Sequence, residues 1–286
     1  MESINRGFQF LAQSWRLANT RRSLFKAAGR GLAAGLLLAL LFSLLAAALL
    51  LVFHFSLIGA FLAGLLGSIG LAALPILSYL CVSSAFPALA TALSGQEPEA
   101  LPTPFMPPRW SDLLSLALAL IPASLLRNRG RGILRAPWTA APELVRPALI
   151  LEKLTLKGAL ARTSGILQSS ALLMHPAQVN VTLVGWLINL PSWLVGAALG
   201  LLAGTSLAQA LPGGWGFILG IACGTLVFGL LASSALAVTQ FTSAAYQICL
   251  YLWVRQVEQG QPGNLPLPLA KALAGASSIT APIFSE

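Results

Sequence analysis

Few residues in this chain of 286 could do chemistry, and they are scattered along it. His54 and His175 are the two histidines, and either could be a single axial ligand to a haem or a chlorophyll-type pigment, although an ordinary interfacial histidine is the simpler interpretation. The cysteines at 81, 223 and 249 show no paired spacing, so we interpret them as small buried apolar residues. No Ser-His-Asp set, paired-carboxylate site, phosphate loop or zinc-ligand pattern occurs, and we therefore expect no enzymatic activity, cofactor or metal.

A few uncharged polar residues lie within long apolar stretches. Asn189 with Pro191, and Gln240 with Gln247, could line a polar path for a small neutral or lipidic solute. Hydrogen bonds between helices, at about 0.6 kcal/mol each, explain the same residues and are the interpretation we favour.

The elements that position these residues follow from the distribution of charge. Residues 31–95 and 163–254 contain no Asp, Glu, Lys or Arg. A charge at the centre of a lipid-facing helix costs about 2.5 to 3.5 kcal/mol, which selects for such blocks. The chain is 57% hydrophobic and 9% charged, far from the roughly 25% charged residues of a soluble domain. The sequence therefore predicts an integral membrane protein.

Each uncharged block suits two crossings, because one crossing needs about 20 apolar residues. We predict an all-α, polytopic membrane helix bundle with four transmembrane helices in two hairpins, residues 31–95 and 177–254. The spans are expected at 32–53, 59–92, 179–202 and 216–253, with turns at 54–58 and 205–215. Pro75 and Pro87 are expected to kink the second span.

The remaining segments carry the charge and set the orientation. Basic residues concentrate in residues 1–30 and 96–176, so the positive-inside rule places both segments and both termini in the cytoplasm of a bacterial cell. Residues 96–176 combine a Pro-rich linker with a basic collar, and residues 255–286 form a Pro-rich tail. We expect Pro147 to begin a short collar helix and Gly158 to perturb its join to the next one.

Interfacial helices are expected in two places. Residues 1–30 are predicted to be an amphipathic helix with Phe8, Leu11, Trp15 and Ala18 on its apolar face. Residues 112–126 are interpreted as interfacial or re-entrant rather than as a fifth span, since crossing there would require a return through residues 147–156, which are charged.

Basic residues beside the spans are predicted to bind anionic lipid headgroups, at about 1 kcal/mol per residue. The set comprises Arg16, Arg21, Arg22, Lys26, Arg127, Arg129, Arg131 and Arg135. The run from 127 to 135 only superficially resembles an RNA-binding arginine-glycine segment, and no nucleic-acid partner is expected.

Small residues recur every four positions in three of the predicted spans. The three runs are Gly59, Ala63 and Gly67; Gly196, Gly200 and Gly204; and Gly216, Gly220 and Gly224. Such ridges let helix backbones approach closely. They indicate tight packing within the bundle or, as a less favoured alternative, an interface with a partner.

Several short motifs resemble a family of bacterial multi-pass membrane proteins of unknown function. The motifs are Ser14-Trp15-Arg16, Ala136-Pro137-Trp138, the stretch from Pro147 to Glu152 followed by Ala159 to Ser164, and Tyr246 to Tyr251. The resemblance implies a membrane bundle and no activity.

These observations favour a non-catalytic accessory or scaffold subunit of a larger membrane assembly, with other membrane subunits or further copies of the chain as partners. A transporter or channel for a small neutral or lipidic solute is the alternative. A pigment- or haem-binding subunit is the third possibility.

Overall fold

The computed structural model describes residues 2–20, 22–53, 56–94, 110–126, 142–169, 181–211, 214–259 and 268, and no strand occurs among them. The helices are α1 (Glu2–Thr20), α2 (Arg22–Val52), α3 (Leu57–Ser83), α4 (Phe86–Leu93), α5 (Trp110–Leu126), α7 (Pro142–Leu151), α8 (Leu156–Ser169), α9 (Val181–Ala210) and α10 (Gly214–Glu258). The prediction of an all-α fold is confirmed.

Four of these helices have stretches long and apolar enough to cross a membrane. They are Gly29–Val52, Leu57–Ser83, Val181–Ala210 and Gly216–Glu258. The chain is thus a multi-pass membrane protein with four candidate spans, as the sequence predicts. The stretch from 112 to 126, considered above as a fifth span, falls in α5, which is not among them and packs against α3 and α8.

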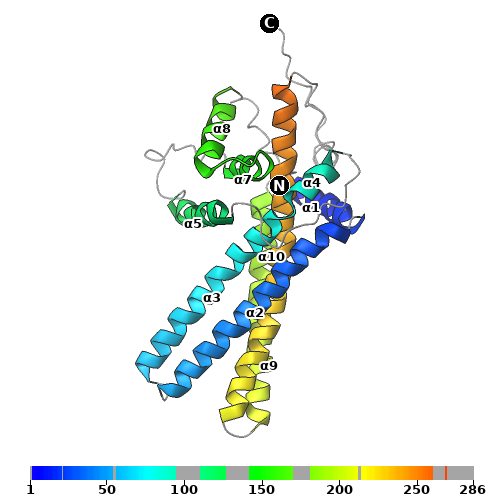
Figure 1. Ribbon diagram of the computed structural model, residues 1–286. Helices are drawn as coiled ribbons and strands as arrows, with labels where there is room; N and C mark the ends of the chain where they lie inside the picture. Colours follow the sequence, from blue (N-terminus) through cyan, green and yellow to red (C-terminus); the bar gives the residue numbers. More distant parts are fainter. Residues whose placement is uncertain are drawn as a thin grey trace.

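The spans form two hairpins, α2 with α3 and α9 with α10, which meet chiefly where α2 crosses α10. Figure 1 shows the hairpins together near α7 and α8 and diverging toward the loops that close them. At the crossing, a Cβ added to Gly229 of α10 would lie 3.1 Å from Leu36 Cδ2 of α2. A small residue at this position therefore keeps the two hairpins close.

The second span ends earlier than the sequence suggests. We expected one kinked helix over 59–92, but α3 ends at Ser83 and a separate helix, α4, begins at Phe86. Pro87 lies in the first turn of α4, where its missing N–H leaves no helical hydrogen bond unmade. Pro75 lies inside α3, as expected.

The glycines of α9 and α10 allow these two helices to pack backbone against backbone. A Cβ added to Gly200 would lie 2.5 Å from Gly224 O, and one added to Gly204 would lie 2.8 Å from Gly220 O. No side chain fits in either place without separating the helices. The ridges of α9 and α10 thus meet each other within one chain.

The run in α3 behaves differently. A Cβ added to Gly59 would lie 2.7 Å from Phe53 Cβ, across the turn that closes the first hairpin. Ala63 is buried, whereas a Cβ added to Gly67 would meet nothing within 4 Å. This run is therefore not a continuous ridge against another backbone.

The last helix extends beyond the bilayer. Its 45 residues span about 67 Å at 1.5 Å per residue, roughly twice the 30 Å hydrocarbon core. The collar helices α7 and α8 lie beside its C-terminal part, with α7 in contact with it, and α5 lies across the bundle at the same end (Figure 1).

The N-terminal helix docks on the bundle through a face that was not predicted. Phe10, Ser14 and Ala18 are buried, and the Phe10 ring meets the Tyr246 ring of α10 edge-on at 5.7 Å. Phe8 and Trp15, seven residues apart, lie on the opposite side and are 41% and 37% exposed. Phe8, Leu11 and Trp15 lie along one stripe of α1, as expected. Ala18 was expected on that stripe but belongs to the face that docks on the bundle.

Candidate functional site at the junction of collar and bundle

Arg146 is the largest fully buried side chain of the described residues. It lies on α7 and reaches the end of α3, where Nε donates to Ser83 Oγ at 2.9 Å and a terminal nitrogen donates to Tyr79 O at 2.7 Å. Its Cζ is 3.7 Å from the centre of the Tyr79 ring and 4.6 Å from that of Phe86. The guanidinium is therefore enclosed by the end of one span and the start of α4.

This arginine remains charged although it is buried. Loss of hydration lowers the pKa of Arg146 to about 10, which is still well above neutral pH. Among the described side chains no carboxylate pairs with it. The charge is offset instead by the negative C-terminal end of the α3 dipole and by the faces of the two aromatic rings.

A second polar cluster joins the other side of the collar to α10. The Tyr251 hydroxyl donates to Glu152 Oε1, and Arg162 Nε lies 3.5 Å from Glu152 Oε2. Arg162 also donates to Glu258 Oε1 at 3.0 Å. The hydrogen bond to Glu258 raises the pKa of the Arg162 guanidinium. One arginine on α8 thus links a carboxylate after α7 to another at the end of α10.

The turn between α7 and α8 positions Glu152 for this contact. Lys153 has φ of 54°, the left-handed conformation that commonly ends helices, and Thr155 caps α8 by accepting the Gly158 N–H at 3.2 Å. Two expectations were wrong here. The collar helix begins at Pro142 with Pro147 inside it, and the break falls at residues 152–155 with Gly158 already inside α8.

These contacts hold the collar helices in place against α3 and α10. None of them aligns a nucleophile with a base. Among the described residues no group of His, Cys, Asp and Glu could hold a metal ion. Cys81, Cys223 and Cys249 are free thiols on α3 and α10. The contacts attach α7 to the end of α3 and α8 to the end of α10.

Most of the predicted ligand and lipid residues lie outside the described part of the chain. These are His54, His175, Arg21, Arg127, Arg129, Arg131 and Arg135. Arg22 and Lys26 are described only as backbone of α2, and Arg16 is exposed on α1. Arg16 is thus the one member of the basic set whose side chain the structure describes, and lipid binding by the set stays a prediction.

The predicted polar residues divide between two faces of α10. The Asn189 amide donates to Thr239 Oγ1 at 3.2 Å, which joins α9 to α10. Gln247 Nε2 donates to Ser243 Oγ at 3.4 Å on α10 itself. Gln240 and Gln247 lie on the same face of α10 as Gly229, 11 and 18 residues further along the helix.

Arg146 belongs to the basic segment 96–176, and its burial was not predicted from the sequence. The available signal was its isolation within the apolar run from Leu144 to Leu151. Its partners Tyr79 and Ser83 belong to a span more than sixty residues earlier, and no local pattern connects them.

No family model, curated protein or solved structure matches this chain.

Proposed function

We propose that this protein is a non-catalytic accessory or scaffold subunit of a larger membrane assembly. The observation that supports the proposal best is the fixed attachment of α7 and α8 to the spans through Arg146 and the Glu152, Arg162, Glu258 cluster. Burying a charge costs free energy of desolvation. In this protein the buried guanidinium of Arg146 holds the collar helix α7 against α3 rather than a ligand. The collar offers a surface on which a partner can dock.

The proposed setting is a bacterial cytoplasmic membrane with both termini and the collar in the cytoplasm. The basic balance of the segments outside the spans supports this orientation. Anionic headgroups are the proposed lipid partners of the exposed Arg16 and the other basic residues near the spans. A partner protein, or a second copy of the chain, would contact the outer face of α8, where Lys157 and Ala161 are exposed.

Photocrosslinking in native membranes tests the proposal. A benzophenone amino acid at Ala161, on the exposed face of α8, is expected to capture one defined protein, while the same group at Phe61, 71% exposed on α3, captures lipid. Arg146→Ala is expected to weaken the Ala161 crosslink because it loosens the collar. If Ala161 captures no protein and the purified particle is a partner-free monomer, the scaffold role is wrong.

The alternative is a transporter or channel for a small neutral solute. It is favoured by the polar side chains of Ser233, Gln240 and Gln247, whose spacing puts them on one face of α10. A flux assay in proteoliposomes decides this point. Loss of flux in the Gln240→Leu, Gln247→Leu double variant would support a polar path, whereas retained flux would exclude these residues from it.

A further inference from the structure

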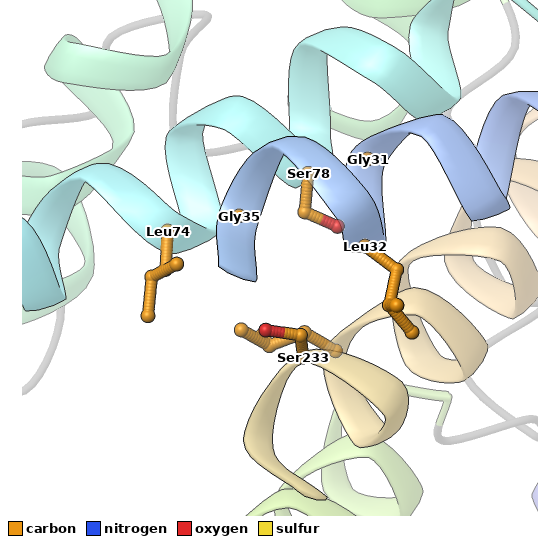
Figure 2. A pocket seen from close by; sticks show the side chains of 7 residues that line it. Gly31, Leu32, Gly35, Leu74, Ser78 and Ser233 are labelled. Atoms are coloured by element: carbon orange, nitrogen blue, oxygen red, sulfur yellow. The ribbon is translucent and has the colours of Figure 1, made fainter. Parts of the chain in front are cut away.

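A small cavity of about 10 Å³ lies where the two hairpins meet. It is lined by Gly31, Leu32, Gly35, Leu74, Ser78, Ser233 and Leu236, from α2, α3 and α10. Figure 2 shows Ser78 of α3 and Ser233 of α10 on opposite sides of this space, with Gly31 and Gly35 of α2 beside it. The volume is at the lower limit for one water molecule.

One polar atom at this cavity has no protein partner. Ser233 is 6% exposed, and its hydroxyl oxygen is fully buried without a protein hydrogen-bond partner. Its neighbour Ser234 behaves differently, since its hydroxyl donates to Leu230 O at 2.6 Å. A buried hydroxyl without a partner is destabilising, so a bound molecule that accepts or donates a hydrogen bond there is favoured.

The surrounding residues preserve the space. A Cβ added to Gly35 would lie 3.6 Å from Ser233 Oγ and 3.3 Å from Leu74 Cδ2, and one added to Gly31 would lie 3.1 Å from Cys81 Cβ. Any side chain at Gly35 would therefore take up the volume beside the hydroxyl. Two hydroxyls from different hairpins also supply the two polar partners that a buried water needs at minimum.

We propose that this cavity binds one water molecule, which bridges Ser78 and Ser233 and joins the two hairpins within the membrane. The bridge supplies the partner that Ser233 otherwise lacks and connects α3 to α10 at a contact formed mainly by small residues. Water bridges are nearly as favourable as direct hydrogen bonds and exchange readily. The site does not depend on the proposed scaffold role.

Hydroxyl-radical footprinting of the full-length protein in lipid nanodiscs, read by mass spectrometry, tests the proposal because radicals formed from bound water label adjacent side chains. Leu74 and Leu236 are expected to be labelled above the level of Leu89, which is fully buried in α4. In Ser233→Ala the labelling should fall to the level of Leu89. Ser234→Ala is the matched control and should leave it unchanged.

The direction in which Ser233→Ala shifts the thermal unfolding midpoint tests the proposal independently. If water bridges the serines, Ser233→Ala removes a satisfied hydroxyl and lowers the unfolding midpoint relative to Ser234→Ala. If the hydroxyl is unsatisfied, the same change removes a penalty and raises the midpoint. Absent labelling in the wild type, labelling that persists in Ser233→Ala, or a raised midpoint would each overturn the proposal.

Discussion

Arg146 combines burial, charge and reach in a single side chain. Its planar guanidinium donates to a span that ends at Ser83 and at the same time stacks on aromatic rings at Tyr79 and Phe86. Lysine could match the charge but not this geometry, because its ammonium is a compact, strongly hydrated point charge. The residue therefore works through shape and hydrogen bonding as much as through its charge.

Replacing Arg146 with alanine is expected to loosen α7 by about 2 to 5 kcal/mol, because two charged hydrogen bonds and two cation–π contacts are lost while the cost of burying the guanidinium is relieved. Hydrogen-deuterium exchange over residues 142–151 is the measurement, with Lys157→Ala on the exposed face of α8 as the control. We expect Arg146→Lys to restore little of the protection. Full protection in Arg146→Lys would mean that charge alone holds the collar.

The helices of the bundle pack by two distinct means. Between α9 and α10, glycines permit contact between backbones, whereas α1 docks through the large Phe10 ring against Tyr246. In lipid, close van der Waals contact replaces the hydrophobic effect as the main force between helices. The helices therefore pack through small residues within the spans and through a large ring where α1 docks at the collar end.

Substituting Gly220 with alanine is expected to destabilise the second hairpin, since the new Cβ would lie 2.6 Å from Gly204 O. Gly67→Ala in α3 is the matched control, because nothing lies within 4 Å of its added Cβ and alanine favours a helix by up to about 1 kcal/mol. Thermal unfolding in detergent should thus show a lower midpoint for the first variant and an unchanged or higher one for the second. Equal midpoints would contradict this packing.

Removing the Phe10 ring is expected to detach α1 from the bundle. Phe10→Ala should cost about 3 to 5 kcal/mol, as for other buried aromatic residues, while Phe8→Ala on the exposed side should have little effect. Limited proteolysis within residues 2–20 measures the difference. Faster cleavage in Phe8→Ala than in Phe10→Ala would show that α1 docks by the other face.

The number of candidate spans and the all-α class could be predicted because hydropathy and charge act along the sequence and require no partner. The break before Phe86, the docking face of α1 and the burial of Arg146 could not, since each depends on a distant segment. The glycines of α9 and α10 were recognised from their spacing, but only the fold pairs Gly200 with Gly224. Local periodicity therefore predicted the elements, and tertiary contact determined which faces they use.

At the scale of the whole molecule, the fold has two chemically different ends. The loops that close the hairpins, at Ser56 and Leu211, are separated from the collar by the length of the spans (Figure 1). The polar contacts of Arg146, Glu152 and Arg162 are all at the collar end. If the four candidate spans cross the membrane, the collar and the loops lie on opposite sides of it, and the scaffold proposal depends on that separation.

Cysteine labelling in intact cells with a membrane-impermeant maleimide tests this arrangement most directly. Single cysteines replace Ser56, Leu211, Ala161 or Gln259, each outside the spans or on an exposed collar face, and the wild type with Cys81, Cys223 and Cys249 gives the background. We expect Ser56→Cys and Leu211→Cys to be labelled in intact cells, and the other two only after permeabilisation. Labelling of Ser56→Cys and Ala161→Cys from the same side would contradict the four-span arrangement.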